Sequence, residues 1–159
     1  MQKSLIINNL EFAQNQLKLV DSFDVDLLTR LTETLVVQDK TQVNFELVGN
    51  GKQFRQPSLD LRIKTDLPVI CQRCLNQMTI HLALSYHYLV CDVENDVPED
   101  DDEIDWLESN HEMNLLELIE DELLLAMPIA PTHKEACNKT SMQSGEKPNP
   151  FAVLKGKIK

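Results

Sequence analysis

Two pairs of potential metal ligands stand out in the sequence. Cys71-Gln-Arg-Cys74 places two residues between its cysteines, a spacing that lets both thiolates point at one ion, as in zinc knuckles. One such pair supplies only half of a tetrahedral site. His133-Lys-Glu-Ala-Cys137 has a spacing compatible with the other half. We therefore hypothesise a structural zinc held by Cys71, Cys74, His133 and Cys137.

Other interpretations of the cysteine pair stay open. The remaining ligands could equally come from Cys91, His81 or His87, because nothing in the sequence brings distant segments together. His81 and His87 themselves lie about 20 Å apart along one strand, too far apart to share an ion, and are expected at the surface. Alternatively, both cysteines are small buried side chains in a turn, inert in a reducing cell. Redox catalysis is disfavoured, because a thioredoxin-like pair opens a helix, whereas here a strand pattern follows.

The overall composition is that of one soluble globular domain. The chain has 159 residues, of which 42% are hydrophobic and 26% charged, and a chain of this size folds without disulfides or metal. The longest apolar stretch, Leu123–Ile129, is far shorter than the ~20 residues that span a bilayer. The first nine residues become polar too soon for a secretory signal. With four cysteines and no export signal, we expect a cytoplasmic protein with free or metal-bound thiols.

The net charge of −11 is unevenly distributed along the chain. Residues 1–74 carry nine basic and nine acidic side chains, whereas residues 75–133 carry fifteen acidic ones and no Lys or Arg. Six lysines and two acids follow from residue 134 onward. The middle of the chain therefore repels nucleic acid, and only the tail attracts it. The acidic region either keeps the protein soluble or meets a basic partner, such as a ribosomal or other RNA-binding protein.

Alternating apolar and polar residues predict three strands. The runs cover residues 43–47, 59–63 and 78–90, and residues 17–20 form a weaker candidate. Gly49-Asn50-Gly51 is a strong hairpin turn signal after the first run. The connections are too short for helical crossovers, so the strands should form an antiparallel meander with one face in water.

Two main helices are expected to pack on this sheet. The first starts after Ser22 or Asp24 and continues to Leu35. The second starts at Asn114, with Glu117 completing a box-like cap, and runs through Met127 until Pro128 stops it. Its apolar stripe comprises Leu116, Ile119, Leu123 and Met127, and its predicted outward residues are Glu117, Glu120 and Asp121. The fold class is therefore α+β.

Two segments are expected to be flexible. Residues 92–110 are dense in like charges and are predicted to form a mobile acidic loop, with Trp106 and Leu107 anchoring its far end. Residues 138–159 form a polar tail with lysines near its end. We therefore predict a single α+β domain over residues 1–137, followed by a flexible basic tail over residues 138–159.

Three pieces of the sequence together resemble the YceD family of bacterial proteins. They are Cys71-Gln-Arg-Cys74-Leu75, Glu117-Leu-Ile-Glu-Asp-Glu-Leu-Leu-Leu-Ala-Met-Pro128 and Lys147-Pro-Asn-Pro-Phe-Ala-Val-Leu154. Each piece alone is weak, but their order, with an acidic segment between the first two, makes the match specific. Some members carry extra cysteines after the proline-terminated helix that look metal-binding. This chain departs from that pattern, because it has only Cys137 there, with His133 nearby.

The resemblance implies a non-enzymatic cytoplasmic factor that supports accumulation of the 23S large-subunit ribosomal RNA through its synthesis, processing or stability. It supplies no catalytic residues. The sequence itself contains no phosphate-cradling glycine loop, nucleophile elbow or catalytic triad signature. We therefore expect a protein that is not an enzyme, has no small-molecule substrate and does not enter membranes.

Two segments are candidate partner-binding sites. The tail, through Lys147, Pro148, Pro150 and Phe151, is expected to stay extended and dock on large-subunit ribosomal RNA precursor or on an assembly factor. The acidic run Asp100-Asp101-Asp102-Glu103 is expected to hold a basic ribosomal protein or to keep the body off RNA. In an alternative hypothesis, the protein is an acidic chaperone or adaptor for one basic ribosomal protein, and its effect on RNA is indirect.

Overall fold

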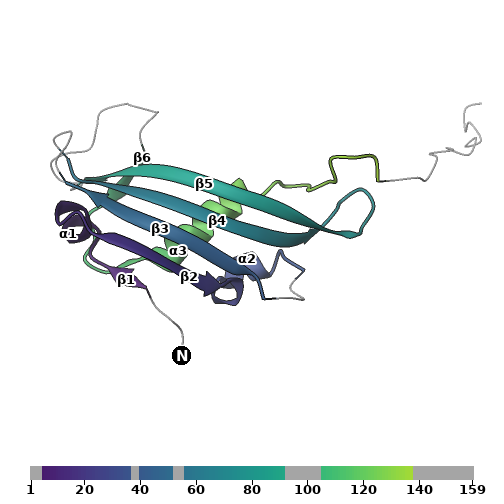
Figure 1. The fold of residues 1–159 in the computed structure, drawn as a ribbon, viewed down its shortest axis with the longest axis horizontal. Helices are drawn as coiled ribbons and strands as arrows, with labels where there is room; N and C mark the ends of the chain where they lie inside the picture. Colours follow the sequence, from purple (N-terminus) through teal and green to yellow (C-terminus); the bar gives the residue numbers. More distant parts are fainter. Residues whose placement is uncertain (1–4, 37–39, 52–55, 92–104, 138–159) are drawn as a thin grey trace, which may run out of the picture.

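A computed structural model describes residues 5–36, 40–51, 56–91 and 105–137. A five-stranded sheet with strand order β2-β3-β4-β5-β6 dominates it, and a two-stranded ribbon of β1 and β7 lies beside it (Figure 1). The strands are β1 (Ile6–Ile7), β2 (Lys18–Asp24), β3 (Gln42–Asn50), β4 (Ser58–Ile70), β5 (Gln77–Cys91), β6 (Asp105–Glu108) and β7 (Met113–Asn114). The helices are α1 (Asn9–Gln14), the 3₁₀ turn η1 (Val25–Leu27), α2 (Thr29–Thr32) and α3 (Leu115–Ala126).

The α+β fold class and the antiparallel meander are confirmed. Strands β2 to β5 pair antiparallel in chain order, and their alternate side chains are buried against the helices. Phe45 on β3 and Leu61 and Ile63 on β4 belong to this core. The predicted strand at residues 17–20 is longer than expected and continues to Asp24. Apolar side chains at every second position thus fix which sheet face meets the helices.

Helix α3 forms as predicted, with one correction to its orientation. The Asn114 side chain caps it by accepting a hydrogen bond from the Leu116 amide, and it also bonds the Glu117 carboxylate. Ile119 and Leu123 are buried in the core. Glu120, expected to face water, is buried instead, because a partner for its charge lies on α2. Within the described residues, neither α3 nor any other helix is long and apolar enough to cross a membrane.

The helix predicted to run to Leu35 is broken into the turn η1 and the four-residue α2. Asp24 caps η1, and the Thr32 and Thr34 hydroxyls bond back to carbonyls three residues earlier. Such back-bonding competes with a regular helix, which explains why the predicted helix does not continue. The short α2 is held in place by Glu120 of α3, which accepts hydrogen bonds from the Arg30 and Leu31 amides.

The far end of the acidic segment predicted over residues 92–110 is anchored at Trp106 and Leu107, as expected, but it is a strand and not a loop there. Asp105–Glu108 forms β6, which pairs parallel to the last residues of β5. The buried Asn9 of α1 holds the end of β6, because its side-chain amide donates to the Glu108 carbonyl and accepts from the Asn110 amide. Residues 92–104 of the predicted loop lie outside the described residues, as does the tail.

The predicted turn Gly49-Asn50-Gly51 also lies elsewhere than expected. Gly49 and Asn50 still belong to β3, and Asn50 pairs with Ser58 at the end of the β3–β4 ladder. A Cβ atom at Gly49 would lie 2.3 Å from the Phe12 carbonyl oxygen of α1. Glycine is needed here because the backbone of α1 rests directly on β3, not because a turn requires it.

Candidate metal centre

The cysteine pair lies in the turn between β4 and β5, as the sequence predicted. The last ladder pair is Ile70 with Gln77, and the turn closes when the Cys71 amide donates to the Asn76 carbonyl. The Leu75 amide donates back to the Cys71 carbonyl, and Leu75 has a positive φ of 61°. This tight backbone turn aims the Cys71 and Cys74 side chains to the same side.

The second pair of ligands is brought to this turn by the chain that follows α3. The helix ends at Ala126, and its C-cap residue Met127 has an extended backbone before Pro128. The next segment, residues 128–137, runs back to the β4–β5 turn, where the Gln72 amide donates to the Pro131 carbonyl at 2.8 Å. His133 and Cys137 therefore arrive beside the cysteine pair, although about 60 residues separate them in sequence.

The four predicted ligands form one compact cluster. One ligand atom from each of Cys71, Cys74, His133 and Cys137 lies within 4.8 Å of all the others. The Cys71 and Cys137 Sγ atoms are 3.7 Å apart, and Cys74 Sγ is 3.5 Å from His133 Nδ1. A tetrahedral zinc with ordinary bond lengths separates two sulfurs by about 3.8 Å, and a sulfur from a nitrogen by about 3.5 Å. The donor set and its spacing therefore fit zinc. No other such cluster was found among the described residues.

Arg73, between the two cysteines, ties the halves of the cluster together. Its Nε donates to Cys137 Sγ at 3.1 Å, and its terminal nitrogen donates to the carbonyls of His133 and Glu135. Sequence reasoning missed this residue, because the spacing of ligands says nothing about which side chain reaches the neighbouring carbonyls. A guanidinium carries several donors in fixed directions, so it suits this task better than a lysine.

The environment favours the thiolate form at two of the three cysteines. Burial of Cys71 opposes its ionisation, but backbone amides, first those of Cys74 and Arg73, outweigh burial and lower the pKa of this thiol to about 5. Burial opposes ionisation of Cys137 as well, and the Arg73 guanidinium lowers its pKa below the usual range. At Cys74 the Asn76 amide favours the thiolate, but burial and the neighbouring sulfurs raise its pKa. Thiolates are the form that binds metal.

At His133, in contrast, the environment favours the protonated form. Hydrogen bonding to Cys137, and then to Cys71, raises the pKa of the imidazole above its usual value. A metal ligand must be the neutral ring, so a metal ion entering this cluster competes with a proton at His133.

The other candidate ligands do not join this cluster. Cys91 is buried at the opposite end of β5, where its thiol donates to the Gln56 side chain. His81 and His87 are exposed on the sheet and pair with Asp66 and Asp60. Two candidate partner-binding sets lie outside the described residues. They are Asp100, Asp101, Asp102 and Glu103, and Lys147, Pro148, Pro150 and Phe151.

Comparison with known proteins identifies the family of this chain. The family model described as "Large ribosomal RNA subunit accumulation protein YceD" matches residues 59–156. A Haemophilus influenzae protein with that same name is 30% identical over 164 aligned positions, which cover 94% of this chain and 92% of the relative. The chain belongs to the YceD family. The YceD match includes both halves of the cluster as well as α3. No solved structure matches the chain.

Proposed function

We propose that this YceD-family protein is a non-enzymatic factor that supports accumulation of 23S ribosomal RNA in the cytoplasm, through RNA synthesis, processing or stability. The observation that carries this proposal is the similarity, over nearly the whole chain, to a protein named for accumulation of the large ribosomal RNA subunit. The cluster agrees with a structural role, because four protein side chains would fill a tetrahedral site and leave no position open for a reacting water.

Removal of the gene tests this role. In the deletion strain we expect the ratio of 23S to 16S ribosomal RNA to fall, and a plasmid copy of the wild-type gene to restore it. An unchanged ratio in growing cells would contradict the proposed function.

We further propose that Cys71, Cys74, Cys137 and the neutral ring of His133 hold one structural zinc. The ion would fasten residues 128–137 to the β4–β5 turn, which hydrogen bonds from Gln72 and Arg73 already hold together. Its chemistry would be electrostatic: a divalent cation compensates thiolates that would otherwise repel one another.

Metal analysis of the purified full-length protein tests the zinc. We expect about one zinc per chain in the wild type, and loss of it in Cys137→Ser. Cys91→Ser is the matched control, because Cys91 is a cysteine remote from the cluster. Wild-type protein that neither contains zinc nor takes it up on addition would refute the site.

The tail remains our proposed contact with large-subunit RNA precursor or an assembly factor, through Lys147, Pro148, Pro150 and Phe151. Deleting residues 147–159 should abolish rescue of the RNA ratio without changing the melting temperature. Full rescue by the truncated protein would exclude this role.

A second candidate is the chaperone or adaptor for a basic ribosomal protein, with an indirect effect on RNA. The feature that favours it is on α3, where Leu125 is 80% exposed on a helix that carries acids and no basic residue. Asp100, Asp101, Asp102 and Glu103 would add to that acidic surface. Pulldown of the native protein distinguishes the two: neutralising these four acids should release a basic protein if the chaperone hypothesis holds, and leave RNA recovery unchanged otherwise.

A further inference from the structure

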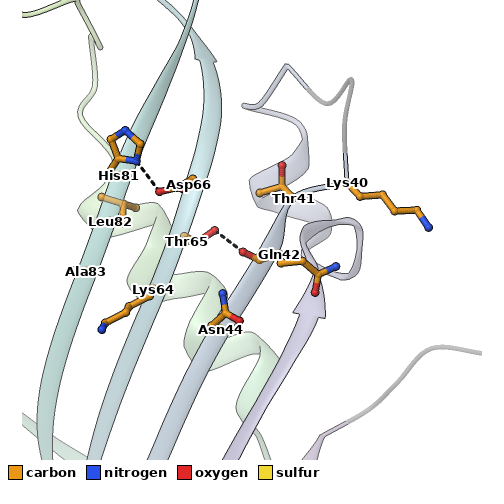
Figure 2. Close-up of a pocket in the computed structure, with 10 residues that line it drawn as sticks. All are labelled: Lys40, Thr41, Gln42, Asn44, Lys64, Thr65, Asp66, His81, Leu82 and Ala83. Atoms are coloured by element: carbon orange, nitrogen blue, oxygen red, sulfur yellow. Dashed lines mark hydrogen bonds and ion pairs between the residues drawn. The ribbon is translucent and has the colours of Figure 1, made fainter.

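The sheet face opposite the helices carries charges of both signs (Figure 1). A hollow of about 570 Å³ on this face is lined by Lys40, Lys64, Asp66 and His81, among others (Figure 2). Asp66 and His81 lie 2.6 Å apart, and both are exposed. Cations and a carboxylate side by side favour no single class of ligand, so the cysteine cluster is the more specific chemical feature of the molecule.

Two sulfurs of the cluster come from segments that are distant in the sequence. Cys71 Sγ and Cys137 Sγ are 3.7 Å apart, although 66 positions separate the two residues. The sulfurs of a disulfide are about 2 Å apart, so these two atoms must approach by about 1.7 Å more to form one. Cys137 lies in residues 128–137, which contain no helix or strand, so its side chain can make this movement without breaking regular structure.

The surroundings of Cys137 suit attack by a small oxidant. Cys71 is buried, whereas Cys137 is half-buried and reached by solvent. The Arg73 guanidinium lies beside it, with Nε 3.1 Å from Cys137 Sγ. A cation at this position stabilises the negative charge of a departing hydroxide. Zinc holds its cysteines as thiolates, which is the form that an oxidant attacks.

We propose that hydrogen peroxide converts the cluster from a zinc site into a disulfide between Cys71 and Cys137. This inference rests on the structural zinc proposed above and names how that site is regulated. The Cys137 thiolate attacks peroxide: a sulfur–oxygen bond forms, the oxygen–oxygen bond breaks, and hydroxide leaves. The Cys71 thiolate then attacks the Cys137 sulfur, and a second hydroxide leaves. The two sulfurs lose two electrons, which peroxide gains. Both hydroxides take up protons to become water, and the metal leaves as Zn²⁺.

The disulfide keeps residues 128–137 fastened to the β4–β5 turn after the metal is lost. It joins the same two segments that zinc joins, and a covalent link across so long a loop stabilises the folded chain. Cys74 and His133, whose Sγ and Nδ1 atoms are 3.5 Å apart, are left as a free thiol and a free imidazole. Oxidation therefore changes the metal content of the protein and preserves its architecture.

Treatment of the zinc-loaded full-length protein with hydrogen peroxide tests the inference. A zinc-binding dye follows release of the metal, and mass spectrometry of unreduced peptides locates the new bond. We expect about one zinc to be released for each Cys71–Cys137 disulfide formed, with Cys74 still open to alkylation. Dithiothreitol and added zinc should reverse both changes. The oxidised protein should melt several degrees above reduced protein from which zinc has been removed.

Three variants separate this route from general thiol oxidation. Cys74→Ser keeps both bond partners and should form the disulfide at a rate within about twofold of that of the zinc-free wild type. Arg73→Gln removes the cation beside Cys137 and should slow the reaction by about tenfold or more. Cys91→Ser is the matched control and should behave as the wild type, because Cys91 lies at the other end of β5. Circular dichroism establishes that the variants fold.

Several results would overturn the inference. They are a disulfide between Cys71 and Cys74, a disulfide between two chains, sulfinic acid at Cys137 without a disulfide, or zinc that stays bound under peroxide. The test separates this inference from the proposed function. If the protein binds zinc but Cys71 and Cys137 do not join, only the redox response fails. If the protein takes up no zinc, the proposed metal site fails, and peroxide then reports on the two thiols alone. The RNA ratio in the deletion strain is measured independently of both.

Discussion

A single buried carboxylate joins two helices that lie far apart in the sequence. Glu120 of α3 accepts hydrogen bonds from the Arg30 amide at 2.7 Å and the Leu31 amide at 3.1 Å, which belong to the second and third residues of α2. It also pairs with the Arg30 guanidinium at 2.9 Å. A four-residue helix is too short to be stable alone, so this cap is what holds α2 in its conformation.

Truncation of this side chain should therefore be costly. Glu120→Ala leaves the Arg30 and Leu31 amides without their acceptor, whereas the Arg30 guanidinium keeps its ion pair with Asp121 at 2.7 Å. We expect the free energy of unfolding to fall by about 3 kcal/mol. Glu120→Gln keeps one oxygen acceptor and should lose about half as much. Urea denaturation of both variants measures this, and an alanine variant as stable as the wild type would contradict the capping role.

The two tyrosines of the chain report on the contact between β5 and α3. The Tyr88 hydroxyl donates to the Glu122 carboxylate at 2.6 Å, and Tyr86 stacks on Tyr88 with ring centroids 6.0 Å apart. Burial, and then the nearby Glu122 carboxylate, raise the pKa of Tyr86 to about 12 and the pKa of Tyr88 well above its usual range. Both phenols are thus held in the protonated form.

This arrangement predicts a pH dependence with a definite sign. Because the folded-state pKa of Tyr86 exceeds the unfolded value of about 10, its contribution to stability is complete below pH 10 and is lost as the pH rises through 12. Absorbance at 295 nm should show little tyrosinate in the folded protein below about pH 11. Glu122→Gln should bring the titration closer to pH 10. A midpoint near 10 in the folded wild type would contradict the buried hydrogen bond.

At the scale of elements, the backbone of α1 lies directly against β3 at Gly49. Gly49→Ala would place a Cβ atom 2.3 Å from the Phe12 carbonyl oxygen and 2.9 Å from Ala13 Cα, both backbone atoms. We expect this variant to lose about 2 kcal/mol of stability, because α1 must move away from the sheet. Gly51→Ala is the matched control: its Cβ meets the flexible Gln16 side chain, so thermal denaturation should show little change.

The elements differ in how well they can be predicted from the sequence. Long periodic segments such as β4, β5 and α3 were predictable, because their apolar spacing is set by the core that they face. The six residues of α1 and four of β6 are too short for a periodic signal, and long-range contacts of Asn9 position them. Glu120 was predicted to face water because its partner Arg30 lies 90 positions away, so that no local pattern reveals their contact.

At the scale of the molecule, zinc should stiffen the side of the fold where the β4–β5 turn meets residues 128–137. Removal of zinc by a strong chelator should raise hydrogen exchange in residues 71–76 and 128–137 by about tenfold or more. Exchange within α3 should change little, because its buried leucines hold it independently. Faster hydrogen exchange along the whole chain, or no change near the cluster, would contradict a local stabilising effect of zinc.

The candidate site could be foreseen only in part. The spacing of Cys71 with Cys74 and of His133 with Cys137 suggested two halves of a site, and the structure brings all four together. Spacing alone did not reveal Arg73, whose partners are two backbone carbonyls and the Cys137 sulfur. The division at residue 137 stays a prediction, because residues 138–159 lie outside the described residues.

The path by which the two halves of the cluster meet has a consequence for the order of folding. Cys71 and Cys74 lie in a local hairpin, whose strands pair early because its loop is short. Joining Cys137 to Cys71 instead closes a loop of 66 residues that contains β5, β6 and α3. We therefore expect zinc capture in two kinetic phases: rapid binding by the hairpin, then slower completion once α3 has docked. Mixing experiments with metal-free protein should resolve both phases, and Cys137→Ser should retain only the first.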